Sequence, residues 1–202
     1  MALFAFSRRR VSCDLVFPFE FNSSFPLMKH YNFADKFRSL YDQAVNLYAS
    51  GVTDQKQYFS PEERAFLAAN GISVQNMFDY AEDHHGYGEP GYDRALAIET
   101  VRRDYFLNVQ QGKAPTRVLD ADTMPSKTDA VEGIVWLPRL LPKAKAKLRG
   151  ELPANLMYSC GGDRQFFRKH DIHPAEFLSL VWRNFDNDPA TIAWVLKRTE
   201  AK

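Results

Sequence analysis

The sequence has few cysteines, no long apolar run and almost no net charge. Two cysteines in 202 residues are too few for a disulfide framework, so we expect a reducing, cytoplasmic environment. No apolar run approaches the length that spans a bilayer. The 26 basic residues are balanced by 25 acidic ones. We therefore expect neither nucleic acid nor a membrane as the partner.

Familiar catalytic signatures are also missing from the chain. It contains no Cys-x-x-Cys, His-Glu-x-x-His, Gly-x-Ser-x-Gly, dinucleotide-binding or Walker pattern. No segment shows a convincing alternation of apolar and polar residues, which disfavours a substantial sheet. The sequence thus identifies neither a cofactor nor a reaction, and the fold must be inferred from helical periodicity.

The first 27 residues carry apolar and aromatic residues without a helical period. The segment begins "MALFAFSRRR", with its arginines after the apolar residues, whereas a secretory signal has the reverse order. We interpret residues 1–27 as a poorly ordered extension, or as upstream sequence translated from an early start codon. The alternative is an arm that docks through its phenylalanines.

From Phe33 onward, apolar residues recur at helical spacing. The clearest helix is "SPEERAFLAANG", in which Ser60 is the N-cap, Pro61 takes the first position and Glu63 completes a capping box. Further helices are predicted on both sides of residue 120. The pattern predicts an all-α, multi-helical protein without a substantial sheet.

A loss of periodicity divides the chain into two helical subdomains. Residues 113–130 contain two prolines and no helical spacing, so they are the predicted linker. The N-terminal subdomain is then 28–112 and the C-terminal one 131–202. Because Pro138 and Pro142 disfavour helix in the residues before them, we expect the first helix of the second subdomain to run from about Pro142 to Leu148.

The C-terminal subdomain resembles a bacterial domain family of unknown function over roughly residues 124–197. The matching pattern is Leu-Pro-Arg, Lys, Gly, Tyr-x-x-Cys-x-x-Asp and two aromatic residues, with a closing Trp. It falls on Leu137, Pro138, Arg139, Lys143, Gly150, Cys160, Asp163, Phe166, Phe167, Asp188 and Trp194. The resemblance implies a small helical fold but carries no activity to transfer.

Two departures from that pattern are visible. The family has an acidic residue where this chain has Pro142, and it has Pro-Leu where this chain has Gly161 and Gly162. If the acidic residue served chemistry in the family, this chain has lost that function.

Cys160 is the strongest candidate nucleophile. Asp163 is the predicted N-cap of the following helix, which would place Cys160 just outside the helix N-terminus, and His170 is the candidate base. The interpretation that we favour is structural, with Cys160 buried beside apolar neighbours.

The segment "DYAEDHHGYGEP" is the densest polar cluster. Glu82 and His85 have the Glu-x-x-His spacing of carboxylate-bridged metal sites. No second Glu-x-x-His occurs, so the alternative is a solvated helix end on which the histidines complement the helix dipole. Glu82 and His85 are the candidate metal ligands.

Four further residues are candidates for binding an anionic ligand or a protein partner: Arg139, Arg102, Lys143 and Asp163. Arg139 ranks highest, because an arginine within the apolar "WLPRLL" needs a partner. For Arg102, a structural ion pair with Glu82 or Asp83 is the favoured interpretation. The lysines of "PKAKAKLRG" are expected on a solvated face.

Two hypotheses of function follow from these candidates. The first is a binding module for a ligand or protein, without catalysis. The alternative is a small enzyme that uses Cys160 as a nucleophile, or a metal bound near Glu82 and His85.

Overall fold

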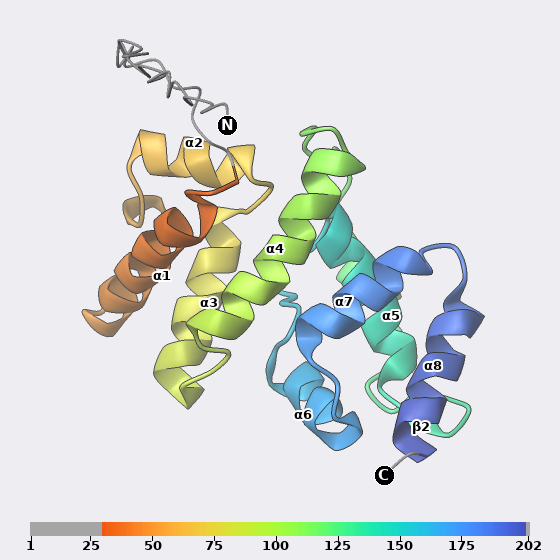
Figure 1. Ribbon diagram of the computed structural model, residues 1–202. Helices are drawn as coiled ribbons and strands as arrows, with labels where there is room; N and C mark the ends of the chain where they lie inside the picture. Colours follow the sequence, from red (N-terminus) through yellow and green to blue (C-terminus); the bar gives the residue numbers. More distant parts are fainter. Residues whose placement is uncertain (1–29, 201–202) are drawn as a thin grey trace, which may run out of the picture.

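The computed structural model describes residues 30–200 and shows an α-helical protein (Figure 1). The segment 1–27, predicted to be an extension, lies outside the described residues, as does Cys13. The helices are α1 (Phe33–Ala49), α2 (Pro61–Ala69), α3 (Val74–Tyr87), α4 (Tyr92–Asn108), α5 (Leu137–Arg149), α6 (Gly161–His170), α7 (Pro174–Arg183) and α8 (Asp188–Glu200). Two short 3₁₀ turns (Gln55–Gln57 and Ala121–Thr123) and the antiparallel pair β1 (Ala130–Val131) and β2 (Ile134–Val135) complete the described part. The all-α prediction is confirmed.

Helix α2 begins as the sequence predicts. The backbone N–H of Glu63 donates to Ser60 Oγ, and the backbone N–H of Ser60 donates to Glu63 Oε2, so both halves of the capping box are present. The helix α3 has the same arrangement between Ser73 and Asn76. These local bonds satisfy backbone donors that have no partner within the helix.

Helix α5 begins earlier than predicted. It runs from Leu137 and contains Pro142 within it, rather than starting there. Pro138 sits in the first turn, where its missing N–H removes no helical bond. At Pro142 one bond to the carbonyl of Pro138 is lost, and tertiary packing of the buried Leu140 and Leu141 outweighs this local cost.

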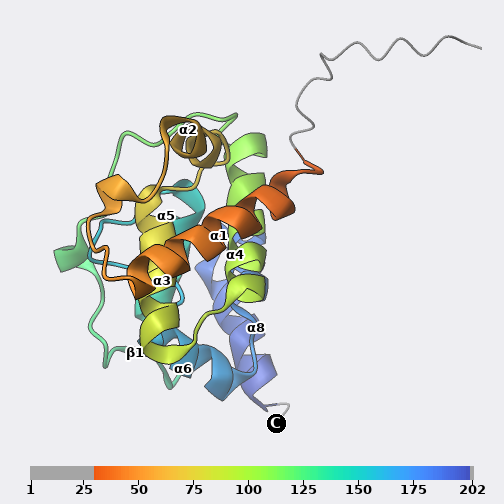
Figure 2. The same cartoon turned by 90° about the vertical axis from the view of Figure 1, so that its left-hand side faces the viewer.

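The N-terminal helices enclose one apolar core. Buried side chains of α1 and α3, among them Phe37, Leu40 and Met77, meet beneath α2. Figure 2 shows α1 crossing obliquely over α3 and α4. This core has no strand in it, consistent with helix-on-helix packing.

A second core lies among α4, α5, α6, α7 and α8. Its members include Leu137, Phe167 and Phe177 of the C-terminal helices, and also Ile98 and Tyr105 of α4. Helix α4 therefore packs against α5 and α7 as well as α1, and it runs through the middle of the molecule in Figure 1. No helix among the described residues is long and apolar enough to cross a membrane.

Candidate functional site

A cavity of about 390 Å³ brings together several of the residues selected from the sequence. We call it the α3–α5 cavity. It is lined by Asp79, Glu82, Asp83, Lys127, Trp136, Arg139, Lys143, Ala154, Asn155, Leu156, Met157, Cys160 and Gly162. Its volume is in the range of small-molecule sites.

A buried ion pair supports one side of the cavity. Lys143 Nζ lies 2.8 Å and 3.0 Å from the two carboxylate oxygens of Asp163, and the side chains are 1% and 0% exposed. The expectation of a solvated face was wrong for Lys143, because its partner is supplied by another helix, 20 residues later in the chain. Such a pair holds both side chains in fixed positions, since leaving either charge unpaired in the interior is costly.

Asp163 organises the backbone around it. It is the third residue of α6 and not its N-cap, since the helix begins at Gly161 and Cys160 is the N-cap. Besides Lys143, it accepts hydrogen bonds from Trp136 Nε1 at 2.9 Å and from the backbone N–H of Ser159 at 2.8 Å. The φ angles of Trp136 and Ser159 are +77° and +68°. Strained positions of this kind persist where the surroundings hold them, often at binding sites.

Gly162 lets α6 approach the indole of Trp136 closely. A Cβ atom at position 162 would lie 2.4 Å from Trp136 Cζ2, closer than any real contact. Gly162 therefore leaves room for the Trp136 ring, which lines the cavity.

Cys160 lies at the wall of the cavity. Its sulfur is 3.5 Å from Lys143 Nζ, and its side chain is partly exposed. The favoured expectation of a buried cysteine is therefore corrected, although the position just before α6 agrees with the sequence.

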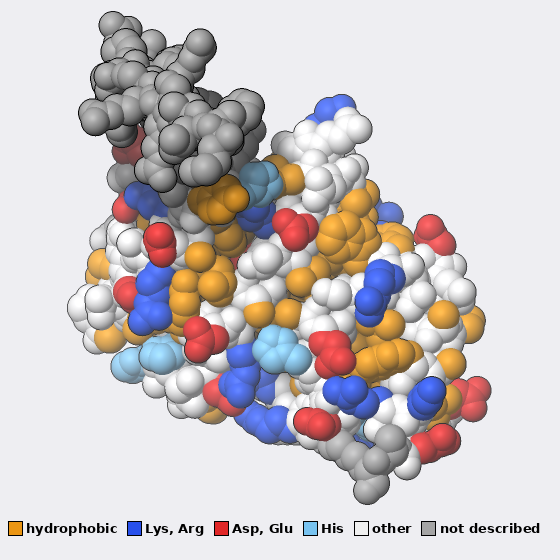
Figure 3. Space-filling model, viewed as in Figure 1, with side chains coloured by type: hydrophobic (Ala, Val, Ile, Leu, Met, Phe, Trp, Pro, Cys, Tyr) orange, Lys and Arg blue, Asp and Glu red, His pale blue; other side chains and the backbone are white. Residues whose placement is uncertain are grey.

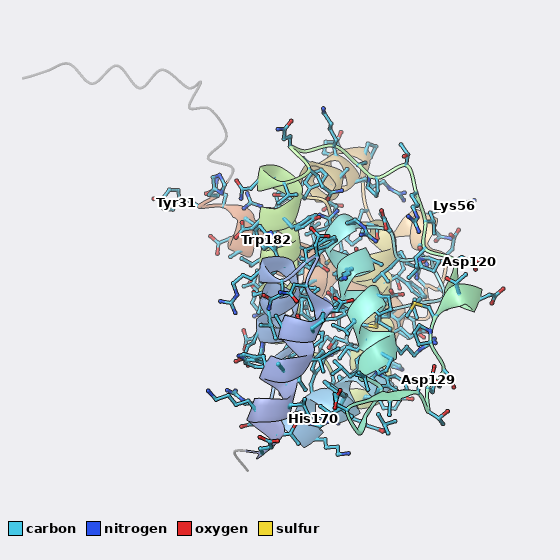
Figure 4. All side chains as sticks on the ribbon, turned by 90° about the vertical axis from the view of Figure 1, so that its right-hand side faces the viewer. Tyr31, Lys56, Asp120, Asp129, His170 and Trp182 are labelled. Atoms are coloured by element: carbon cyan, nitrogen blue, oxygen red, sulfur yellow. The ribbon has the colours of Figure 1, made fainter. Side chains whose placement is uncertain are left out.

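His170 is not positioned to act on Cys160. It is the last residue of α6 whereas Cys160 is the N-cap, so ten helical rises of 1.5 Å separate them, about 15 Å. Its Nδ1 is 2.7 Å from Thr199 Oγ1 of α8, and its ring packs on Phe166. Figure 4 shows His170 near the end of the chain. The described structure thus does not form the predicted pair of nucleophile and base.

Helix α3 contributes three carboxylates to the cavity. Asp83 Oδ2 is 2.5 Å from Arg164 Nη1, so its charge is neutralised. Glu82 is exposed and accepts a hydrogen bond from the hydroxyl of Tyr48, at 3.2 Å. Burial raises the pKa of Asp79 from its ordinary value of 3.8 to about 6, opposed by a hydrogen bond from Gln75. The charge of Asp79, and with it the charge of the cavity wall, therefore changes near pH 6.

Replacing Asp79 with Asn is expected to stabilise the protein above pH 6 but not near pH 4. Between pH 3.8 and 6 the folded state holds a proton on Asp79 that the unfolded state has released, so unfolding free energy falls as pH rises through this window. The buried charge of Asp79 therefore lowers the free energy of unfolding above pH 6, by at most about 3 kcal/mol. Urea titrations from pH 4 to 7.5 would measure it, with Asp93→Asn on the exposed face of α4 as the control. A difference between Asp79→Asn and the wild type that stays constant with pH would contradict the assignment.

Glu82 and His85, the candidate metal ligands, both contact Tyr48, one through its hydroxyl and the other through its ring. Glu82 lines the α3–α5 cavity, whereas His85 is exposed and packs against the ring of Tyr48, with centroids 5.5 Å apart. Within residues 30–200, no group of three or more His, Cys, Asp or Glu side chains is placed to hold a metal ion. The metal site is therefore not among the arrangements that this geometry favours.

The two arginines selected from the sequence lie in different places. Arg139 Nη1 donates to the carbonyl of Pro125 at 2.7 Å, and its partly exposed side chain lines the α3–α5 cavity. Arg102 is buried in a separate cavity. It pairs with neither Glu82 nor Asp83 in the described structure, because Asp83 pairs with Arg164 instead.

Three residues of the site were not among the candidates selected from the sequence: Asp79, Lys127 and Trp136. Asp79 stands in the polar cluster of α3, one turn before Asp83, and its helical spacing was the available signal. No feature of the neighbouring sequence indicates that Trp136 belongs to the site, because a positive φ is unexpected for an aromatic residue.

Comparisons with known proteins place a family over the C-terminal helices. The search of curated proteins and that of solved structures gave no match. A family model described as a domain of unknown function (DUF5069) matches residues 121–202, the part for which the sequence predicted such a resemblance. The matched part contributes Arg139, Lys143 and Cys160 to the lining of the cavity, and also Asp163, which pairs with Lys143. The acidic residues Asp79, Glu82 and Asp83 lie outside the matched part. The C-terminal segment of this chain is therefore similar to the domain of unknown function DUF5069.

Proposed function

We propose that the protein binds a small zwitterion in the α3–α5 cavity. The observation that carries this is charge of both signs around one cavity without an ion pair between its acidic and basic residues. Among residues 30–200, Glu82 and Asp79 of α3 have no ion-pair partner, and neither do Arg139 and Lys127. A ligand with one ammonium and one carboxylate group would satisfy both sets.

The remaining charges of the cavity are already satisfied and act as its frame. Lys143 is held by Asp163, and Asp83 by Arg164. The groups without an ion-pair partner are therefore the ones left to engage a ligand. The Nη1 atom of Arg139 donates to the carbonyl of Pro125, so its Nε and Nη2 atoms form the fork that suits a carboxylate. On the face drawn in Figure 3, acidic and basic side chains are interspersed.

The test is calorimetric titration with glycine, β-alanine and γ-aminobutyrate, each carrying both charges. Propionate and propylamine carry one charge each and are the controls. We expect at least one zwitterion to bind about tenfold or more tightly than either control, since each charge-assisted bond adds about 1.5–3 kcal/mol. Arg139→Gln and Glu82→Gln should each weaken binding by about ten- to a hundred-fold.

Arg38→Gln is the matched control for Arg139→Gln. Arg38 pairs with Asp42 on the exposed surface of α1 and does not line the cavity, so its loss should leave binding unchanged. Protection of Cys160 from iodoacetamide in a Cys13→Ser background locates the ligand, because Cys160 lines the cavity. Equal binding of zwitterions and single-charge controls would refute the proposal.

An enzyme that uses Cys160 is the second candidate function. It is favoured by one observation, the contact of 3.5 Å between Cys160 Sγ and the ammonium of Lys143. The same titrations discriminate the two functions. Chemical conversion of a bound probe by the wild type, absent in Cys160→Ser, would favour the enzyme, whereas unchanged probe and retained binding in Cys160→Ser favour the binding module.

A further inference from the structure

A second cavity, of about 320 Å³, lies where α4 meets α3 and the end of α5. We call it the α4 cavity. Arg102 and Lys147 are the charged residues in its lining, and apolar residues such as Ile72, Phe106 and Leu152 form much of the rest. None of these residues lines the α3–α5 cavity.

The guanidinium of Arg102 is buried, and within residues 30–200 it has no ion-pair partner. The residue is 2% exposed, and its Nη1 atom makes no hydrogen bond to any of the residues that the structure describes. Its carbon Cζ lies over the ring of Phe106, 5.2 Å from the centroid. Burial lowers the pKa of Arg102 to about 10, so the group stays charged at neutral pH.

The neighbouring charges do not neutralise Arg102. Glu99 is fully buried, and its Oε1 accepts from Lys147 Nζ at 2.6 Å and from the hydroxyl of Tyr80 at 2.7 Å. Its other oxygen, Oε2, also has no hydrogen-bond partner within residues 30–200. Because one carboxylate stands against two cations, the group of Glu99, Arg102 and Lys147 carries one net positive charge.

The backbone is shaped to admit the guanidinium. Gly150, the residue that ends α5, has a φ of +74°, and a Cβ atom there would lie 2.5 Å from Arg102 Nη2. A side chain at position 150 would therefore displace Arg102 from the cavity wall.

We propose that the α4 cavity binds a small monocarboxylate with a short apolar tail. A carboxylate accepts two parallel bonds from one guanidinium, and a single negative charge balances the net charge of the group. The apolar lining would take the tail. Because the residues differ from those of the α3–α5 cavity, this proposal holds or fails independently of the proposed zwitterion.

The experiment compares sodium butyrate, butyramide and inorganic phosphate by calorimetric titration of the full chain. Butyramide has the same shape without the charge, and we expect it to bind at least about tenfold more weakly than butyrate. Butyrate should leave alkylation of Cys160 unchanged, which separates it from the other cavity. Equal binding of butyrate and butyramide, or stronger binding of phosphate, would overturn the proposal.

Two variants of Arg102 test whether its guanidinium contacts the carboxylate of butyrate. Arg102→Met removes the charge at similar length and should abolish butyrate binding, whereas Arg38→Gln should not change it. The variant should fold, because no direct ion pair is lost among the described residues. Should it fail to fold, Arg102→Lys keeps the charge without the fork, and binding weakened about tenfold supports the proposal. Unchanged binding in either variant would overturn it.

Discussion

Replacing Lys143 with Met is expected to lower the free energy of unfolding by about 3–5 kcal/mol. The substitution leaves the carboxylate of Asp163 fully buried and without its cation. Trp136 and Ser159 would still donate to that carboxylate, but neutral donors do not balance its charge. Denaturant titration at neutral pH measures the loss.

Lys145→Met is the matched control on the same helix. Lys145 Nζ is 2.7 Å from Asp188, but the Asp188 side chain is 42% exposed, so this pair should contribute less than about 1 kcal/mol. The double variant Lys143→Met, Asp163→Leu removes both buried charges and should recover part of the loss. A cost for Lys143→Met no greater than for Lys145→Met would contradict the role assigned to the buried pair.

A fragment of residues 114–202 begins after α4 and therefore lacks it. We expect this fragment to show no cooperative unfolding transition. It lacks Ile98 and Tyr105, which belong to the core of the C-terminal helices. Each such side chain contributes about 1.5–3 kcal/mol when buried. Without α4, the faces of α5 and α7 that pack against it also become exposed to water. The loss of both side chains, about 3–6 kcal/mol, is comparable with the whole stability of a marginal domain, since domains are stable by about 5–15 kcal/mol.

The longer fragment 91–202 includes α4 and should unfold cooperatively in the same urea titration. Its Glu99→Gln variant keeps the apolar contacts of α4 but removes the ion pair, so it separates the two contributions. The comparison also tests the subdomain boundary predicted at residues 113–130. Identical transitions for 114–202 and 91–202 would show that α4 is not needed by the C-terminal helices.

The helices that could be predicted from the sequence are those with local signals at their ends. Ser60, Pro61 and Glu63 fix the start of α2 through contacts within four residues, so the printed sequence is sufficient. The start of α5 could not be predicted in this way. There the packing of Leu140 and Leu141 overrides the local effect of Pro142, and packing partners far along the chain are invisible to periodicity.

Several residues of the candidate site could be predicted from the sequence, but their position in one cavity could not. Arg139, Lys143, Cys160 and Glu82 were each selected, and the structure brings all four to one cavity. The sequence could not show that Lys143 is buried, because the spacing of lysines in α5 resembles a solvated face and its partner is on α6. Nor could it show that Arg102 belongs elsewhere, since only the tertiary structure separates α4 from the α3–α5 cavity.

The position of Trp136 gives the α3–α5 cavity an optical reporter of its own. Its indole lines the cavity, donates to Asp163, and lies 5.8 Å from the ammonium of Lys143, measured to the ring centroid. Indole emission shifts with the polarity and charge around the ring. All three tryptophans pack against the C-terminal core, but Trp182 and Trp194 are not among the residues that line the cavity. Changes of charge or occupancy in the cavity are thus readable in the intrinsic fluorescence of one side chain, without any attached label.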